Sequence, residues 1–562
     1  MHNMLLIHNN NVPSLQAFPQ RIRFKMHSSD IDEYITNEII PEIKTQQFDC
    51  ICIKDTLSSN YLELYGLRLA YHIRLSQELQ DKRFVPIIIL SDLDSYLLNK
   101  ITPMSNILFT KNIFIIKNSI DAIKSIAANT LPYLSVQEYE KTFLSRILIE
   151  SPKDYLTHHS ITNEWSIYQW SNLLEISSDA IKKNSDKISS MLYFKYLIAK
   201  YQLQIKTKNK TKQTDKQGRV LLIDDKWNDG WNDILKSFVS QQYTDVQLSV
   251  MEYDFKDKTI EDIKKAVQIK INDSQPDVVL LDLRLLESDN TLKINKKKSI
   301  NKLSGIQIIS EIKKINPGIQ IIMFTASGDS LILDELHNKG ILGYVKKDAP
   351  TDKYETSKNS FKKLDTLLKK GIDKNYLKKI WKLESDILKQ SFLQNTNKLL
   401  SENQQVIFEL RKNIQFIFEI LNSNVPNPFV YAMLAIFKSI ELLNAYYIEE
   451  NWMKNKKYSF WRGSNSKIQT LDYGTLRDTK DGDYNLSSEN KIMAIIKEKT
   501  SIREDTIVNV IKQLICSRNY AMHPSEKDSC KDFLIKEPKA EHIVNWFDML
   551  YDIFKSLQED KS

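Results

Sequence analysis

Glycine is scarce in this chain, at only 12 of 562 residues. The sequence contains neither a GxGxxG run nor a Walker-type loop. Loops of these kinds need closely spaced glycines so that backbone amides can approach a phosphate. Their absence argues against an enzyme that hydrolyses nucleotides.

Cysteine and long apolar runs are also rare. Only four cysteines occur, Cys50, Cys52, Cys516 and Cys530, without the spacing of metal ligands. This pattern favours a reducing cytoplasm. No apolar run reaches the ~18 residues that a membrane-spanning helix needs, and no charged-then-apolar leader opens the chain. We therefore expect no membrane span and no secretion signal.

An excess of charge of one sign is missing too. The 79 basic and 71 acidic side chains leave a net charge of +8, which permits a polyanionic partner without demanding one. Hydrophobic residues make up 42% and charged residues 27% of the chain, as in ordinary globular proteins. The length indicates three or four domains.

Residues 218–348 contain four short apolar runs separated by helical patterns at 262–271 and 305–315. This alternation predicts a parallel α/β sheet. Polar residues follow directly on the four runs: Asp224 and Asp225, Asp282, Thr325, and Tyr344 with Lys347. Because ligands bind at the carboxyl ends of parallel strands, we expect these side chains to gather at one edge.

The three carboxylates at this edge predict a cation site. Crowded carboxylates repel each other and raise each other's pKa values unless a cation joins them, and an all-oxygen cluster suits Mg²⁺. A hydroxyl and an ammonium group beside them can hold the oxygens of a phosphoryl group. The alternative is an ordinary flavodoxin-like sheet with solvated loop acids. Four successive strand ends that carry carboxylate, hydroxyl and ammonium groups favour a cation and phosphoryl site over this alternative.

This stretch resembles the receiver domain of two-component response regulators. The resemblance implies that Asp282 accepts a phosphoryl group from a sensor histidine kinase. It also implies further roles: Asp224, Asp225 and Asp282 with the carbonyl of Arg284 as Mg²⁺ ligands, and Thr325, Tyr344 and Lys347 as the groups that respond to phosphorylation.

Two features depart from the receiver pattern. A lysine-rich insertion covers about residues 287–303, and we expect a solvated loop there, with control of the site as the alternative. Asp348 follows Lys347 where proline is commoner, a change that we expect to leave the chemistry intact.

Residues 1–132 repeat the strand and helix rhythm with altered site residues. His8 and Asn9 stand at the positions of the acid pair, and Lys54 stands at that of the phosphoacceptor. Ser91 and Lys117 keep the hydroxyl and ammonium positions. We therefore predict a pseudo-receiver used for contact or dimerisation. A shifted alignment, with Asp55 as acceptor, is the alternative.

Residues 133–217 predict a helical connector that ends in a basic linker. Apolar residues recur there at helical spacing, and the tail KTKNKTKQTDKQGR is polar and rich in lysine. His158 and His159 lie on this connector. We expect a structural role for them, and phosphoryl relay is the alternative.

Residues 372–562 predict an all-α bundle, because long amphipathic patterns follow one another with no α/β signal. On one of these helices Arg518 falls in the same stripe as Ile511 and Leu514, where an arginine is costly without a partner. His523 follows five residues later, just before Pro524. An arginine and an imidazole suit RNA cleavage, in which one stabilises charge and the other moves protons. The alternative is that Arg518 pairs with a core acid and His523 caps the helix.

The segment RNYAMHP resembles the Arg-polar-x-x-x-His motif of HEPN domains, helical bundles many of which are metal-independent ribonucleases that act as dimers. The resemblance implies that Arg518 and His523 are catalytic, that Asn519 orients them, and that this site needs no cofactor. Glu441 is a weaker candidate partner.

We thus predict a multidomain α/β plus all-α protein in four parts: a pseudo-receiver at 1–132, a connector at 133–217, a phosphoacceptor receiver at 218–371 and a HEPN-like bundle at 372–562. The predicted function is phosphorylation-regulated RNA cleavage by a cytoplasmic homodimer. The rival function is a non-catalytic, phospho-regulated adaptor. A transcription factor is disfavoured, because no helix-turn-helix or basic recognition helix follows the receiver.

Overall fold

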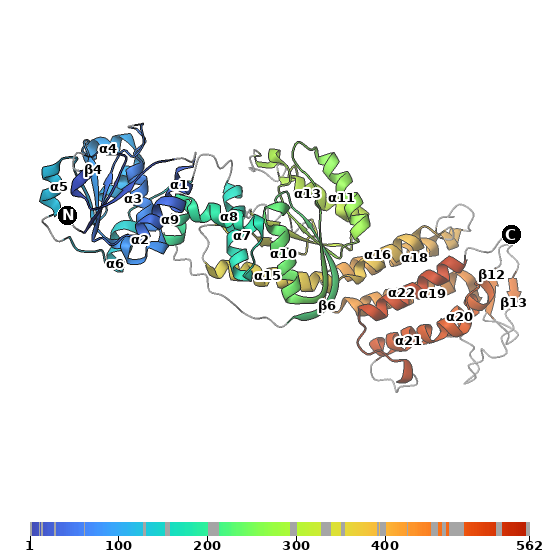
Figure 1. The fold of residues 1–562 in the computed structure, drawn as a ribbon. Coiled ribbons are helices and arrows are strands. Elements are labelled where there is room, and N and C mark those ends of the chain that lie inside the picture. The colour runs from blue at the N-terminus through green and yellow to red at the C-terminus, as the bar shows by residue number, and fades with distance from the viewer. Residues whose placement is uncertain are drawn as a thin grey trace.

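The structure is a computed structural model of the chain, in which two sheet domains and a helical bundle follow one another in an elongated arrangement (Figure 1). The residues that it describes are 3–10, 12, 15–26, 30–60, 62–127, 131–151, 158–200, 213–290, 292, 300–326, 336, 339–349, 354–390, 393, 401–423, 425–450, 459–462, 468–470, 488–523 and 531–557.

The first domain is a five-stranded parallel sheet in the order β2-β1-β3-β4-β5. Its strands are β1 (Met4–His8), β2 (Gln20–Arg23), β3 (Cys50–Lys54), β4 (Ile87–Ser91) and β5 (Ile113–Lys117). Its helical segments include α1 (Ile31–Tyr34), η2 (Ile35–Ile39), α2 (Ile40–Thr45), α3 (Tyr65–Leu75), α4 (Ser95–Ile101) and α5 (Ile120–Ala127). The strands β1, β3 and β4 are buried along their whole length, as expected where helices cover both faces of a sheet.

The second domain repeats this topology in the order β10-β9-β8-β6-β7, again with all strands parallel. Its strands are β6 (Thr214–Ile223), β7 (Tyr243–Val250), β8 (Val278–Leu281), β9 (Gln320–Thr325) and β10 (Gly343–Lys346). Its helices include α10 (Trp231–Gln242), α11 (Ile260–Ser274), α13 (Ser304–Ile315) and α15 (Tyr354–Asp373). The predicted fold class, two receiver-type sheets followed by a largely helical region, is confirmed.

The sequence prediction missed the same strand in each sheet. Both β2 and β7 lie at an edge, and exposed side chains interrupt their buried ones. An edge strand with a solvated face lacks the continuous apolar run of a central parallel strand. These two strands are therefore defined by pairing with β1 and β6 and not by their own composition.

The connector helices are α6 (Val136–Tyr139), α7 (His158–Leu174), α8 (Asp179–Ser190) and α9 (Leu192–Lys200). Of these, α7 and α8 lie between the two sheet domains in Figure 1. Trp170 of α7 is fully buried in the core of the second domain, where its ring contacts Trp231 and Phe324. Trp165, on the same helix, stacks on Phe194 of α9 in the core of the first domain. One helix thus contributes to both cores.

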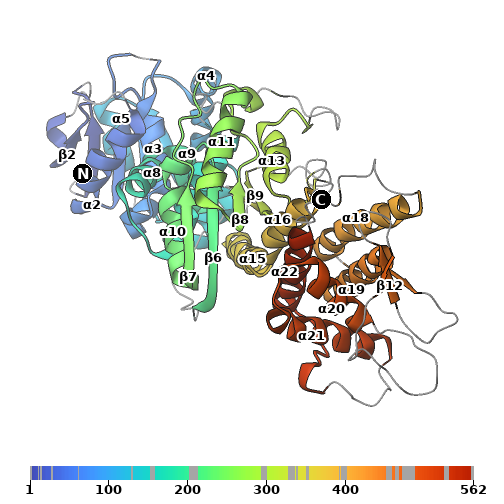
Figure 2. The same ribbon diagram turned by 90° about the vertical axis from the view of Figure 1, so that its right-hand side faces the viewer.

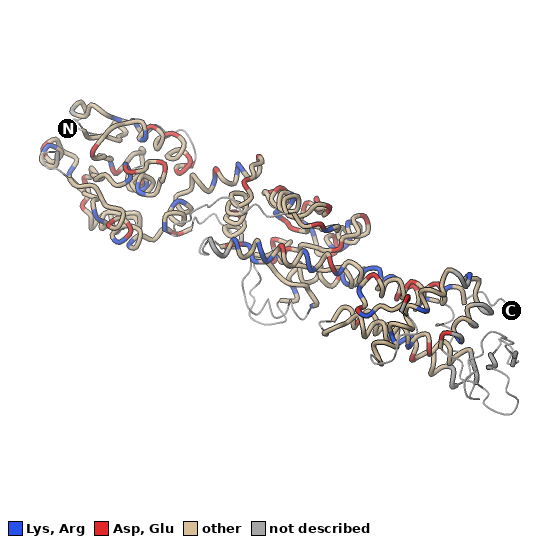
Figure 3. The backbone as a smooth tube through the Cα atoms, turned by 90° about the horizontal axis from the view of Figure 1, so that it is seen from below, with Lys and Arg blue, Asp and Glu red and all other residues tan. Residues whose placement is uncertain are grey.

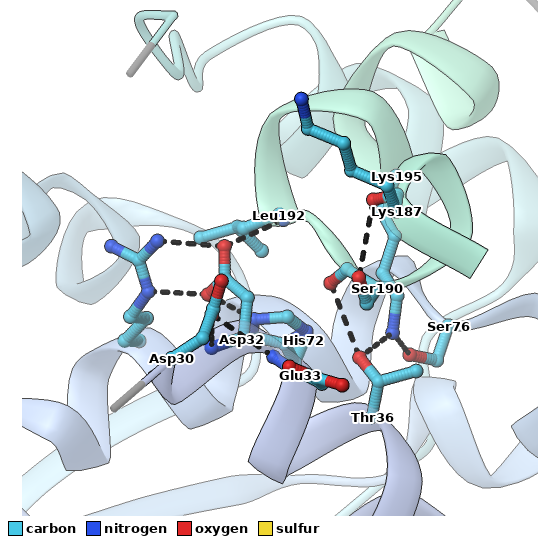
Figure 4. A network of polar contacts seen from close by, with 11 residues as sticks. Asp30, Asp32, Glu33, Thr36, His72, Ser76, Lys187, Ser190, Leu192 and Lys195 are labelled. Atoms are coloured by element: carbon cyan, nitrogen blue, oxygen red, sulfur yellow. Dashed lines mark hydrogen bonds and ion pairs between the residues drawn. The ribbon is translucent and has the colours of Figure 1, made fainter. Parts of the chain in front are cut away.

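Figure 4 shows the polar contacts that join the connector to the first domain. The carboxylate of Asp32 accepts hydrogen bonds from the backbone N–H of Leu192 (2.9 Å) and from Arg68 (2.6 and 2.8 Å). The buried Lys195 ammonium donates to the hydroxyls of Thr36 (2.9 Å) and Ser76 (3.0 Å). Because these groups are buried and paired, they fix α9 to the first domain through hydrogen bonds that are shielded from water.

The C-terminal region is a helical bundle reached through α15 and α16, with α18, α19 and α22 side by side (Figure 2). Its helices include α16 (Tyr376–Leu388), α18 (Ser401–Asn422), α19 (Pro428–Tyr447), α20 (Ser488–Lys499), α21 (Glu504–Met522) and α22 (Ala540–Ser556), beside a small antiparallel sheet of β11 (Ile448–Glu450), β12 (Ser459–Arg462) and β13 (Ile468–Thr470). Among the described helices, α19 alone has the length and hydropathy of a membrane span, but 56% of that window is buried inside the protein. This burial is typical of the core helix of a bundle.

Candidate functional site

Lys347 lies at the centre of the candidate site, directly after β10. Its Nζ atom is 2.9 Å from Oδ2 of Asp224 and 3.5 Å from Oδ1 of Asp282, and all three side chains are buried. Asp224 follows β6 and Asp282 follows β8, so both carboxylates stand at the carboxyl edge of the sheet. Burial opposes the charge on Lys347, but Asp224 and Asp282 outweigh it and raise its pKa above the ordinary value.

The acidic side chains of this edge are electrostatically crowded. Burial, followed by repulsion from Asp224 and Asp282, raises the pKa of Asp225 to about 8. Burial also raises the pKa of Asp282 to about 6; Lys347 opposes this shift and Asp224 adds to it. One ammonium group therefore does not balance the three carboxylates, and a further cation would be stabilised here.

Backbone amides hold two of the carboxylates in place. The N–H of Lys226 donates to Asp224 Oδ1 (2.8 Å), and the N–H of Arg284 donates to Asp282 Oδ2 (2.9 Å). The Arg284 side chain turns away to the backbone carbonyl of Asp289. In α13, a Cβ on Gly305 would lie 2.5 Å from the carbonyl oxygen of Asp282, so only glycine allows this close approach of helix to strand end.

The two remaining predicted receiver residues lie on β9 and β10. Thr325 is buried at the end of β9, and its carbonyl accepts the backbone N–H of Lys347 (2.7 Å). Tyr344 of β10 is half-buried, with the Lys363 ammonium 3.7 Å from its ring centroid. The backbone of Thr325 thus lies beside that of Lys347. The ring of Tyr344 instead packs against Lys363 of α15.

Carboxylate oxygens are donors that Mg²⁺ prefers, but within the described residues no three His, Cys, Asp or Glu side chains are arranged to hold a metal ion. Mg²⁺ keeps several waters and is commonly bound by only one or two carboxylates. A three-carboxylate cage is therefore not required. Burial and then repulsion from Asp224 and Asp282 raise the pKa of Asp225, and a bound divalent cation would relieve the repulsion.

The connector supplies part of the site, which the sequence did not predict. Oδ1 of Asn163, on α7, accepts hydrogen bonds from Lys347 Nζ (3.1 Å) and from Trp231 Nε1 (2.7 Å). Nothing local marks Asn163 in the sequence, because its partners lie 68 and 184 residues further along the chain.

Asp348, expected to be a neutral departure from the receiver pattern, has a structural role. Its carboxylate accepts hydrogen bonds from Trp170 Nε1 (2.8 Å) and from Ser360 Oγ (3.0 Å), and its carbonyl accepts one from Ser166 Oγ (2.9 Å). Two of these donors are on α7 and one is on α15. A proline here would lack this carboxylate, so the residue ties the connector to the receiver.

The insertion after Asp282 is anchored at its base. Asp289 of η7 (Glu287–Asn290) is buried and accepts hydrogen bonds from the backbone N–H (3.2 Å) and the hydroxyl of Ser304. Residues 291 and 293–299, which carry most of its lysines, lie outside the described residues, so the expectation of a solvated loop there stays a prediction. The side chains of His158 and His159 also lie outside them.

The corresponding edge of the first sheet contains a paired lysine and aspartate. Lys54 Nζ lies 2.6 Å from Oδ1 of Asp55, which also accepts the backbone N–H of Thr56 (2.7 Å). The Ser91 hydroxyl donates to Oδ2 of Asp55 (2.5 Å). All four residues are buried, whereas Lys117 is exposed. Both carboxylate oxygens of Asp55 are thus occupied within the domain.

Strand register supports the alignment of Lys54 with Asp282. Ile7 pairs with Ile53 in the first sheet, as Ile223 pairs with Leu281 in the second. The next residues are therefore His8 and Lys54 in one domain and the acids Asp224 and Asp282 in the other. A Cβ on Gly66 would meet the carbonyl oxygen of Lys54 at 2.1 Å, as one on Gly305 would meet that of Asp282. The shifted alignment, with Asp55 as acceptor, does not match this register.

The second predicted constellation lies at the end of α21. The guanidinium of Arg518 stands 4.5 Å from the ring centroid of Phe437 on α19, and its Nη1 donates to Oδ1 of Asn519 (2.9 Å). The backbone carbonyl of Asn519 accepts the N–H of His523 (2.8 Å), whose side chain is exposed. Asn519 thus contacts the side chain of Arg518 and the backbone of His523.

Arg518 is half-buried, and not on the inner stripe as the spacing predicted. Cys516 and Ser517 are the buried residues at this turn, because the inner face continues from Leu514 through its i+3 neighbour. Within the described residues the group below Arg518 is the Phe437 ring and not the core acid of the alternative interpretation. Glu441, the weaker candidate, forms an ion pair with Lys438 (3.7 Å). Cys516 is disulfide-bonded, which the cysteine pattern did not predict.

Comparison with known proteins identifies the first domain. Residues 7–116 match the family described as "Inactive Receiver domain", which agrees with the missing acids at His8, Asn9 and Lys54. The matched residues lie within the first sheet domain. No curated protein matches the chain.

Among solved structures, a signal receiver domain of a putative Luxo repressor protein from Vibrio parahaemolyticus is 22% identical, with 28% of this chain and 92% of that chain covered and a TM-score of 0.19. NtrX from Brucella abortus in complex with ADP is 18% identical, with 36% and 34% covered and a TM-score of 0.21. A second structure of NtrX is 14% identical, with 51% and 58% covered and a TM-score of 0.20. This chain therefore spans about a third to somewhat over half of the NtrX chains.

Proposed function

We propose that this receiver-domain protein is a phosphorylation-regulated response regulator whose second receiver accepts a phosphoryl group on Asp282. One observation carries the proposal: the buried Lys347 ammonium lies between Asp224 and Asp282 at the carboxyl edge of a receiver-type sheet. The proposed donor is a sensor histidine kinase of the cytoplasm.

In the proposed reaction an oxygen of the Asp282 carboxylate attacks the phosphorus of the donor. A new P–O bond forms, and the leaving group departs with the electron pair of its own bond to phosphorus. Lys347, whose ammonium lies 3.5 Å from Asp282, and the Thr325 hydroxyl would hold the transferred oxygens. Asp224, Asp225 and Asp282, with the carbonyl of Arg284, would hold Mg²⁺, which when bound supplies positive charge to the phosphoryl oxygens.

Phosphorylation can be tested on the full chain with acetyl phosphate, from which Asp282 would displace acetate. Intact mass spectrometry should show one added phosphoryl group in the presence of Mg²⁺, and none after addition of EDTA. Asp282→Asn should show none under either condition. A wild-type chain that stays unmodified at saturating donor, with Mg²⁺ present, would contradict the proposal.

For the helical bundle we propose RNA cleavage without a metal. Support comes from the exposed imidazole of His523 at the end of α21 and the guanidinium of Arg518 less than two turns away. Asn519 accepts a hydrogen bond from the Arg518 guanidinium through its side chain and one from the His523 backbone N–H through its carbonyl. His523 would transfer a proton to or from the 2′-hydroxyl or the leaving oxygen, while Arg518 stabilises the charged phosphorane. Two such sites would meet in a homodimer, and phosphorylation of the receiver would alter that dimer.

The test is cleavage of total RNA by the purified chain, with and without the phosphoryl mimic beryllofluoride, beside His523→Ala and Arg518→Ala. Cleavage that depends on both residues and changes with the mimic supports a gated ribonuclease. If folded, dimeric variants and the wild type all leave tRNA and mRNA intact, the bundle is instead a non-catalytic adaptor domain. The pseudo-receiver would serve contact or dimerisation in either case.

A further inference from the structure

The Lys347 ammonium has three N–H groups and three neighbouring oxygens, and the distances to these oxygens differ. Asp224 Oδ2 at 2.9 Å and Asn163 Oδ1 at 3.1 Å are within hydrogen-bond range. Asp282 Oδ1 at 3.5 Å is close enough for an ion pair but is longer than an ordinary N–H···O bond. Asp224 and Asn163 therefore accept hydrogen bonds from Lys347, whereas its contact with Asp282 is a longer ion pair.

We propose that Asn163, on the connector helix α7, is a positioning residue for the phosphorylation of Asp282. This inference rests on the phosphoacceptor function proposed above. Asn163 holds the Lys347 ammonium at 3.5 Å from Asp282 Oδ1, so that this contact is an ion pair without a short hydrogen bond. One N–H of the ammonium is then left for the incoming phosphoryl group.

The charges at the site indicate what happens without Asn163. With its amide oxygen gone, the ammonium keeps its ion pairs with Asp224 and Asp282, and a buried cation shifts toward the negative charge that it does not yet contact closely. Lys347 would close the 3.5 Å gap to Asp282 Oδ1. An oxygen that accepts a short, charge-assisted hydrogen bond is a weaker nucleophile, so transfer to it slows.

Asn163 is itself held firmly enough to act in this way. It is only 6% exposed. Its oxygen also accepts the indole N–H of the fully buried Trp231 at 2.7 Å, so both acceptor positions are filled. Trp231 packs edge-on against Phe324 with ring centroids 4.7 Å apart, and Lys347 Nζ lies about equally far from the two rings, at 5.2 and 5.3 Å.

The rest of α7 fixes the helix beside the same segment. Ser166 and Trp170, three and seven residues after Asn163, donate to the backbone and side chain of Asp348. Asn163, Ser166 and Trp170 thus lie on one face of the helix. The docked connector is therefore part of the phosphoacceptor site, and the reactivity of Asp282 depends on a segment outside the receiver.

The experiment measures phosphorylation of the full chain over a range of acetyl phosphate concentrations in wild type, Asn163→Ala, Asn163→Ser and Ser166→Ala. Serine keeps a small polar side chain but ends one atom short of the Lys347 contact. Ser166→Ala is the matched control, because it removes another hydrogen bond from α7 to residues 347–348 without touching Lys347. Thermal unfolding of each variant identifies a variant that has not folded.

We expect the maximal rate to fall about tenfold or more in both Asn163 variants, as for the loss of one charge-assisted hydrogen bond. The half-saturating donor concentration should stay unchanged, and Ser166→Ala should match wild type in both parameters. Wild-type rates in folded Asn163 variants would overturn the inference while the acceptor function stands, and so would an equal loss in Ser166→Ala. A wild-type chain that takes no phosphoryl group overturns the acceptor function itself, and this inference with it.

Discussion

The indole N–H of Trp170 donates a 2.8 Å hydrogen bond to the carboxylate of Asp348, a residue 178 positions later in the chain. This bond connects the connector helix α7 to the residue that follows the lysine of the candidate site. The connector is therefore docked against the functional edge of the receiver. In Figure 3, which views the molecule from below, the connector again lies between the two sheet domains.

Removal of the Asp348 carboxylate should destabilise the second domain. Asp348→Ala leaves the buried Trp170 indole and the Ser360 hydroxyl without their acceptor, at a cost of about 2 to 4 kcal/mol for two buried donors. The measurement is urea unfolding followed by tryptophan fluorescence. Asp373→Ala, which removes a surface ion pair with Lys216, serves as control and should shift stability by less than about 1 kcal/mol. Equal effects of the two changes would show that Asp348 is not a tie between connector and receiver.

Phosphoryl labelling should be confined to the second receiver. Both oxygens of Asp55 are occupied by Lys54, Thr56 and Ser91 in a buried cluster, so acetyl phosphate should leave it unmodified. Peptide mapping after labelling should place the added mass on Asp282 alone. The stoichiometry of labelling should be the same in Asp55→Asn as in wild type. Any label on residues 50–60 would refute the pseudo-receiver assignment.

We expect Glu384 on α16 to make the bundle less stable as pH rises. Its Oε2 is buried without a hydrogen-bond partner among the described residues, and burial with a smaller contribution from Glu419 raises its pKa to about 8. The folded chain then holds a proton that the unfolded chain releases near the ordinary carboxyl value, so stability declines as pH rises toward 8. Glu384→Gln should remove this decline and stabilise the bundle at pH 8 by about 1 to 3 kcal/mol.

Chemical unfolding of Glu384→Gln and wild type at pH 5 and pH 8 tests this expectation. The two proteins should be close in stability at pH 5, where Glu384 is protonated in the fold. Glu419→Gln, which removes the lesser cause of the shift, should recover part of the gain at pH 8. A variant no more stable than wild type at pH 8 would mean that Glu384 is not held protonated in the fold.

The stacking of Arg518 on Phe437 gives a test of the bundle site that is separate from folding. Arg518→Lys keeps the charge but loses the planar group above the ring and the Nη1–H that reaches Asn519. RNA cleavage should fall by about tenfold or more, while the melting temperature stays within a few degrees because Arg518 is only half-buried. Met522→Ala, at an exposed position one turn further on, should leave cleavage unchanged. Full activity in Arg518→Lys would indicate that any cation suffices at this position.

Much of the fold could be predicted locally. The central strands of both sheets are continuous apolar runs, and each run ends at the residue that forms the functional edge. The edge strands β2 and β7 could not be found in this way, because partly solvated edge strands have mixed patterns and depend on pairing with a neighbour. Helical spacing placed Arg518 inside the bundle, yet a shift of one position around the helix leaves it half-buried over an aromatic ring.

The sequence by itself determined which residues reach the site from within the receiver. Asp224, Asp282 and Lys347 each follow an apolar strand and Thr325 is the last residue of one, and parallel strands bring such positions to one edge. Only the tertiary structure decided that Asn163 and Trp170 complete the same edge. Their helix is docked by hydrogen bonds to residues almost 180 or more positions away. A contact of that kind depends on how two domains pack and leaves no periodic pattern in either segment.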